Sequence, residues 1–244
     1  DQDKNVVFQW NSRDHFAITD TFVPLDTAVV DYSHGNSVEM DSDGNLLISS
    51  RHMSEITKVD RDTGAIIWRM GGKNNQFTFI NDTTIPNVGG FSFQHDARRL
   101  PNGHLTLFDN ANQFVDANLR GSRGVEYLVD ETAKTATLVR EFRTTPDVVS
   151  LYMGNTQRLP NGNTLVGWGG GIFVPALTPP TEAITEFTAD GQVAMNANIV
   201  GAPFVSYRAF RFPWHATPTT PPTLVAITAT NPISLYYSWN GATE

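Results

Sequence analysis

The chain has 244 residues, of which 40% are hydrophobic, and its formal net charge is −8. The hydrophobic share supports a sizeable core, whereas the acidic balance excludes nucleic acid as a partner, because phosphate binding needs a basic face. No apolar run reaches the ~18 residues that predict a membrane span. The absence of cysteine excludes disulfides, thiolate metal sites and cysteine catalysis.

The first element expected is a strand. Residues 6–10 form a short apolar run, which we expect to be the last strand of an earlier structural unit. The repeated part of the chain begins after it.

An internal repeat organises the chain from about residue 34. Three turn glycines, Gly44, Gly103 and Gly162, are spaced by 103 − 44 = 59 and 162 − 103 = 59 residues. Each belongs to an Asp-Gly or Asn-Gly pair between two strand-like runs, which is the signal of a tight hairpin. Two further strand-like runs follow in each copy, so the pattern predicts four antiparallel strands per unit.

This arithmetic predicts an all-β fold, a β-propeller with four-stranded antiparallel blades. A β-sandwich has no reason to keep a fixed period, and no helical periodicity is present. At 59 residues per blade the chain covers about four blades, so we expect blades to be missing at the N-terminus, because propellers close with about four to eight. We assign residues 1–212 to the blades. Residues 213–244 begin with a proline-rich stretch, and they are either a linker and final β segment or the start of a second β module.

Polar residues that do not repeat occupy related places in successive copies. His34 and Asn36 are two apart and face the same side of an extended strand, Arg51 follows the second strand, and His95 opens the next copy. Two imidazoles, a guanidinium and an amide suit a tetrahedral oxyanion, and a neutral imidazole is a nucleophile near neutral pH. These four residues form the candidate site. A structural role is the alternative for each of them, and it is the preferred interpretation for His52.

Neither a metal nor a cofactor is expected. Asp41, Asp43, Asp60 and Asp62 lack the spaced set of a calcium loop and fit turn chemistry. No glycine loop of the usual phosphate-binding form is present, so no nucleotide is expected either.

Several motifs in this sequence resemble those of the arylsulfotransferase family, the bacterial-type enzymes that work without a nucleotide sulfate donor. The His-x-Asn, Ser-Ser-Arg-His and Gln-His combination, in this order, is specific. The resemblance implies a six-bladed propeller whose central channel holds a histidine that takes the sulfuryl group covalently. By motif, His95 matches that histidine, His34 and Asn36 match the His-x-Asn pair, and Arg51 matches the arginine that contacts the sulfate. The matching stretches include residues 31–38, 48–52, 63–72 and 93–96.

We therefore expect a secreted, periplasmic or extracellular enzyme that moves a sulfuryl group from an aryl sulfate donor to a phenolic acceptor through a sulfohistidine at His95. The alternative is a non-catalytic extracellular propeller, a binding or assembly module that keeps the scaffold. Its C-terminal β segment would then bind a partner domain or chain. The family also uses a histidine from an earlier blade, and this chain has no clear match for it. A quinone-dependent dehydrogenase, the third hypothesis, lacks a convincing cofactor and calcium constellation.

Overall fold

The structure is a computed structural model of the chain, which describes residues 2–82, 90–111, 121–170, 183–199, 205–213, 223–227 and 234–238. The chain divides into two compact units, Asp1–Phe210 and Arg211–Glu244. Strands dominate the described residues, so the predicted all-β class is confirmed. The helical elements described are 3-10 turns at Ser12–Asp14, Ile18–Asp20 and Arg51–Met53. Among these described segments, no helix is both long and apolar enough to cross a membrane.

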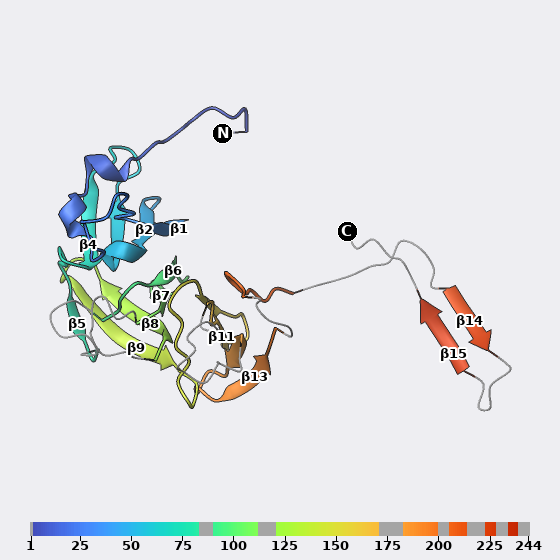
Figure 1. The fold of residues 1–244 in the computed structure, drawn as a ribbon. Helices are drawn as coiled ribbons and strands as arrows, with labels where there is room; N and C mark the ends of the chain where they lie inside the picture. Colours follow the sequence, from blue (N-terminus) through green and yellow to red (C-terminus); the bar gives the residue numbers. More distant parts are fainter. Residues whose placement is uncertain are drawn as a thin grey trace. The chain divides into compact units, whose positions relative to one another are not determined.

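The first sheet consists of four antiparallel strands in chain order (Figure 1). Its first hairpin closes at Gly44, whose φ of 85° is a left-handed conformation that glycine adopts at little cost. The N–H of Gly44 donates to the carbonyl of Asp41 over 2.9 Å. The same turn recurs at Gly103 and Gly162, with φ of 84° and 85°, so the hairpins predicted from the repeat are present. The strands are β1 (Gly35–Met40), β2 (Leu46–Ser50), β3 (Glu55–Val59) and β4 (Ile66–Gly71).

The second sheet has five strands rather than the predicted four. The additional strand, β5 (Thr78–Ile80), comes from the connection between the first two sheets and runs parallel to β9. The open edge of β9 offers unpaired backbone groups, and an extended connection satisfies them. The other strands are β6 (His95–Arg99), β7 (Leu105–Asp109), β8 (Arg123–Asp130) and β9 (Thr135–Phe142).

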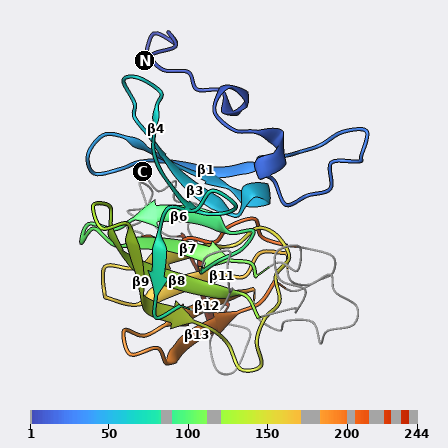
Figure 2. The same cartoon turned by 90° about the vertical axis from the view of Figure 1, so that its left-hand side faces the viewer.

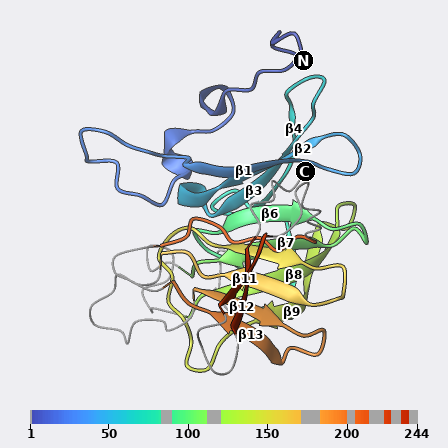
Figure 3. The ribbon, with the colours of Figure 1, turned by 90° about the vertical axis from the view of Figure 1, so that its right-hand side faces the viewer.

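The third sheet again has four antiparallel strands, and the three sheets follow one another in chain order (Figures 2 and 3). The strand that opens each copy of the repeat lies next to the strand that opens the following copy: β1 contacts β6, and β6 contacts β10. This succession agrees with propeller blades, while ring closure and the number of blades stay predictions. The strands of this sheet are β10 (Asn155–Arg158), β11 (Thr164–Gly167), β12 (Ile184–Phe187) and β13 (Val193–Ala197).

The second unit contains one described hairpin, in which β14 (Thr223–Ile227) pairs antiparallel with β15 (Ser234–Ser238). The assignment of residues 213–244 to a linker and final β segment or to a second β module stays a prediction.

Apolar side chains fill the spaces between successive sheets. Trp68 and Leu107 belong to the cluster between the first and second sheets, and Phe108 and Trp168 belong to the cluster between the second and third. These buried contacts hold each sheet against the next one.

Buried ion pairs join the first two sheets beside these apolar clusters. Lys58 lies 3.0 Å from Asp41 and 2.7 Å from Asp43, while Arg99 lies 2.8 Å from Asp41. Burial would raise the pKa of Asp41, but hydrogen bonds from Arg99 and Lys58 outweigh it and lower that pKa to about 2. The carboxylates of the turn residues Asp41 and Asp43 therefore form ion pairs with lysine and arginine side chains of the same chain.

The strand predicted at residues 6–10 is wrong, because this segment has no strand pairing. Trp10 instead donates its indole N–H to the carbonyl of Gly64 over 3.0 Å, and its ring stacks on His15 at 4.7 Å. Apolar composition alone could not distinguish a strand from a segment that packs on a turn of the first sheet.

Candidate functional site

His95 opens β6 and is a buried, neutral imidazole. The Met153 N–H donates to Nε2 over 3.2 Å, so Nε2 carries the lone pair and the proton sits on Nδ1. That proton is donated to Oδ1 of Asn110 over 2.7 Å. Burial, together with the charges of Arg51, His34 and Arg208, outweighs the hydrogen bond to Asn110 and lowers the pKa of His95 to about 3. His95 is therefore uncharged at neutral pH, with a defined tautomer.

Asn110 holds this tautomer from the end of β7. Its amide nitrogen donates to the carbonyls of Ser150 and Met153, both over 3.0 Å. The amide oxygen is therefore turned toward His95, where it can only accept. Asn110 and the segment before β10 together fix the direction of the imidazole.

Arg51 lies directly after β2, as predicted, in the 3-10 turn Arg51–Met53. Its guanidinium lies 4.8 Å from the centre of the Phe93 ring and donates through Nη2 to the carbonyl of Leu151 over 2.7 Å. Burial lowers the pKa of Arg51 to about 10, so it stays charged at neutral pH. Its Nε is buried and has no hydrogen-bond partner among the described residues.

Arg51 and His95 both form hydrogen bonds with the short segment from Leu151 to Met153. Arg51 binds the carbonyl of Leu151, while the amide of Met153, two residues on, binds His95. The guanidinium is also close enough to lower the pKa of His95. The structure thus brings together two of the residues predicted from different repeats.

His34 and Asn36 diverge from the predicted arrangement. His34 precedes β1 rather than lying in it, and its φ of 48° is left-handed, so strand alternation does not place it beside Asn36. Asn36 donates its amide to the carbonyl of Gln94 over 2.7 Å and accepts from the N–H of Asp96 over 3.3 Å. These bonds hold β1 against the start of β6, which is the structural role given as the alternative.

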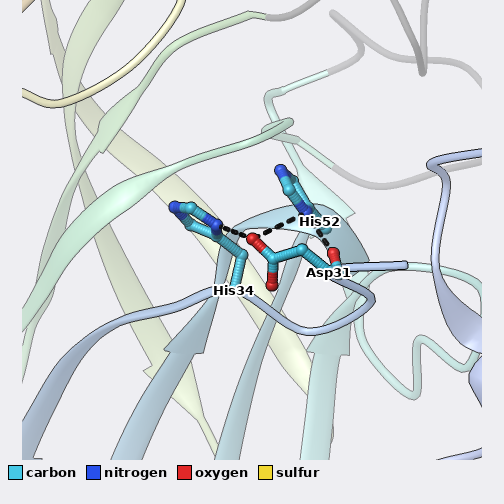
Figure 4. A group of neighbouring side chains, drawn as sticks. All are labelled: Asp31, His34 and His52. Atoms are coloured by element: carbon cyan, nitrogen blue, oxygen red, sulfur yellow. Dashed lines mark hydrogen bonds and ion pairs between the residues drawn. The ribbon is translucent and has the colours of Figure 1, made fainter. Parts of the chain in front are cut away.

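His34 belongs to a compact group with Asp31 and His52 (Figure 4). Nδ1 of His34 contacts Oδ2 of Asp31, and Nδ1 of His52 lies 3.8 Å from the same oxygen. The His34 and His52 rings are 4.5 Å apart. Burial lowers the pKa of His52, although its bond to the Asp31 carbonyl raises it, and the nearby charges of Arg51 and His34 lower it further.

This group has the composition of a metal site, because its ligand atoms lie within 4.8 Å of one another and two imidazoles with a carboxylate suit zinc or iron. The hydrogen bonds oppose that use. Nη1 of Arg51 lies 2.6 Å from Nε2 of His52, and a guanidinium can only donate. Nε2 of His52 therefore accepts, its proton sits on Nδ1, and no lone pair of His52 is directed at Asp31.

Two residues near His95 were not predicted from the sequence. The Tyr207 ring lies 6.2 Å from that of His95, edge to face. Arg208 pairs with Asp96 over 3.3 Å, and its buried Nε has no partner in the described parts of the chain. The repeat gave only an approximate signal, because a fourth copy spaced by 59 residues would begin its first strand at 155 + 59 = 214, just after Tyr207 and Arg208. Asn155 binds both the N–H and the carbonyl of Ala209, over 2.8 and 2.7 Å, as Asn36 binds the backbone beside His95.

A cavity of about 340 Å³ lies elsewhere on the first sheet. It is apolar, and its walls include Trp10, Val38 and Ile48. His34, Asn36, Arg51 and His95 do not line it, although Ser33, Gly35 and Ser50 do.

The described fold and site define an all-β protein whose successive sheets surround a neutral histidine with guanidinium groups. Residues 2–199 match the family model described as Arylsulfotransferase (ASST). The chain belongs to this family, so the resemblance inferred from the motifs is confirmed.

Solved structures offer more distant similarity. A protein of unknown function from Bacteroides caccae has 15% identity and a TM-score of 0.44, covering 71% of this chain and 53% of its own. The PQQ-bound aldose sugar dehydrogenase from Streptomyces coelicolor has 17% identity and a TM-score of 0.41, covering 68% and 48%. The chain thus spans about half the length of each, and neither similarity carries weight at these TM-scores. No curated protein matches the sequence significantly.

Proposed function

We propose that the protein transfers a sulfuryl group from an aryl sulfate to a phenolic acceptor through a covalent intermediate on His95. The observation that carries this proposal is the state of His95, a neutral imidazole whose tautomer leaves a lone pair on Nε2. Membership of the arylsulfotransferase family supports the reaction class. A secreted, periplasmic or extracellular location remains part of the proposal.

Each half of the proposed reaction exchanges one bond to sulfur. Nε2 of His95 attacks the sulfur of the aryl sulfate, the N–S bond forms, and the S–O bond breaks with release of the phenolate. A second phenol then attacks the same sulfur and loses its proton, while the electron pair of the N–S bond returns to His95. Two displacements through one intermediate give ping-pong kinetics, and the transferred group carries three equatorial oxygens, as in phosphoryl transfer.

Arg51 would bind the sulfate oxygens. A guanidinium provides a fixed fork of donors, and the buried Nε of Arg51 is unpartnered within the described residues. Arg208 offers a second Nε of the same kind. The family motif implies that Asn36 completes the donor set through the second N–H of its amide and that His34 lies beside the sulfate.

Attack requires that Nε2 of His95 be released from the Met153 amide. At 3.2 Å this hydrogen bond is at the long end of the usual range, and such a neutral bond contributes only about 0.5–1.5 kcal/mol net. Met153 and Gly154 both have left-handed φ, of 66° and 100°. A small shift of this segment when substrate binds would expose the lone pair.

The proposal is tested by incubating the purified protein with 4-nitrophenyl sulfate and phenol and measuring nitrophenol release. We expect His95→Gln to abolish turnover. His104→Gln is the matched control, because His104 pairs with Glu126 at 2.7 Å near the first turn of the second sheet. Equal rates for wild type and His95→Gln would refute a role for His95 in the reaction.

A non-catalytic binding or assembly module is the second candidate, and one observation favours it. Both ring nitrogens of His95 and both polar atoms of the Asn36 amide are engaged within the protein, as expected of residues that join sheets. Wild-type protein that binds aryl sulfates without releasing nitrophenol would support this candidate.

A further inference from the structure

The backbone around Asp31 is fixed by the 3-10 turn that follows β2. The N–H of Arg51 donates to the carbonyl of His34 over 3.0 Å, and the N–H of His52 donates to the carbonyl of Ser33 over 3.3 Å. These two bonds hold the loop before β1 against the turn. Asp31 and His34 therefore sit on a segment with a defined conformation.

Arg51 and His52 fix the position of Asp31 itself. Because Nε2 of His52 accepts from Arg51 at 2.6 Å, the proton on Nδ1 of His52 is donated to the backbone carbonyl of Asp31. The charged guanidinium thus orders the aspartate through a neutral imidazole, and the carboxylate remains available for His34.

The carboxylate of Asp31 determines which nitrogen of His34 is free. Nδ1 of His34 donates to Oδ2 of Asp31, and in Figure 4 the other ring nitrogen points away from the carboxylate. Burial would raise the pKa of Asp31, but the hydrogen bond from His34, the charges that His34 and His52 carry once protonated at acidic pH, and the charge of Arg51 outweigh it and lower that pKa. The aspartate is therefore ionised at neutral pH.

We infer that Asp31 is a positioning residue that holds His34 with its proton on Nδ1 and its lone pair on Nε2, ready to accept the proton of the phenolic acceptor. This inference rests on the proposed function. As the acceptor oxygen forms its bond to sulfur, the phenol proton moves to Nε2 of His34, and the N–S bond electrons return to His95. Asp31 stays ionised and stabilises the imidazolium, as a carboxylate does when it orients a catalytic histidine.

The chemistry predicts that the need for Asp31 depends on the phenol. 4-Nitrophenolate leaves without a proton, whereas an unsubstituted phenol must lose one during its attack. Asp31→Asn should therefore slow transfer to phenol by about 100-fold or more relative to the nitrophenol burst of the first half-reaction. Asp31→Glu should restore part of the transfer, and Asp62→Asn, a change at an exposed turn aspartate, should behave as wild type.

A second readout does not need activity. In protein labelled with ¹⁵N-histidine, the neutral form of His34 should show the Nδ1–H tautomer in the wild type and lose it in Asp31→Asn. The inference would be overturned if Asp31→Asn slowed both half-reactions equally or left the His34 tautomer unchanged. Zinc binding that depends on Asp31 would also overturn it. The proposed function fails separately, if nitrophenol release does not depend on His95.

Discussion

The neutral state of His95 makes stability depend on pH in a way that can be calculated. Burial lowers the pKa of His95 from 6.5 to about 3, so between these values the unfolded chain binds a proton that the folded chain does not. The contribution of His95 to the free energy of unfolding is therefore fully present above about pH 6.5 and is lost as the pH falls toward 3. Within this window the free energy of unfolding falls by about 1.4 kcal/mol for each pH unit, and by about 5 kcal/mol over the whole window.

The perturbation is His95→Gln, which removes this titration while keeping a polar side chain. Urea unfolding of both proteins between about pH 7.5 and 5 should show the wild type losing about 2 kcal/mol more than the variant, since about 1.5 pH units lie below the unfolded pKa. His52 and the carboxylates titrate in both proteins, so their contributions cancel in the difference. Parallel stability curves would show that His95 is not a buried neutral group and would refute the reasoning.

The remaining predictions concern the ion pairs, the segment beside His95 and the sulfate site. Arg123 is buried against Asp82 at 2.7 Å and Asp109 at 3.0 Å, so Arg123→Met should lower the free energy of unfolding by about 3–5 kcal/mol. Arg143→Met, which breaks a more exposed pair with Glu141, should lower it by no more than about 1 kcal/mol, both values being measured by urea unfolding. A Cβ on Gly154 would lie 2.4 Å from Cδ1 of Phe108, whereas one on Gly103 meets nothing within 4 Å, although both have left-handed φ; Gly154→Ala should therefore lower the melting temperature clearly more than Gly103→Ala. Arg51→Ala should lower kcat/KM for 4-nitrophenyl sulfate by about 100- to 1,000-fold, and an unchanged value would exclude Arg51 from the sulfate site.

The repeat and its hairpins could be predicted because they depend on local chemistry. Gly44, Gly103 and Gly162 need left-handed φ at the same point of each copy, and the sequence shows this directly. The position of Arg51 after β2 and of His95 at the start of β6 followed from the same spacing. The number of strands in the second sheet could not be predicted in the same way, because the additional strand β5 depends on pairing with β9 after that sheet has formed.

The surroundings of the site could not be predicted, because they depend on how successive sheets pack. His95 donates a hydrogen bond to Asn110 and accepts one from Met153, and these residues are 15 and 58 positions away in the sequence. Tyr207 and Arg208 approach from still farther along the chain. The left-handed backbone of His34 also has no signal in the sequence, since glycine, not histidine, is the residue that usually marks such a conformation.

The central claim, that His95 carries the sulfuryl group, is tested most directly by trapping the intermediate. The protein is mixed with 4-nitrophenyl sulfate labelled at sulfur, in the absence of an acceptor, and the modified peptide is identified by mass spectrometry at alkaline pH. The account predicts one sulfuryl group on His95, released when phenol is added. Wild-type protein that turns over the substrate without label on His95, or with label on another residue, would contradict it.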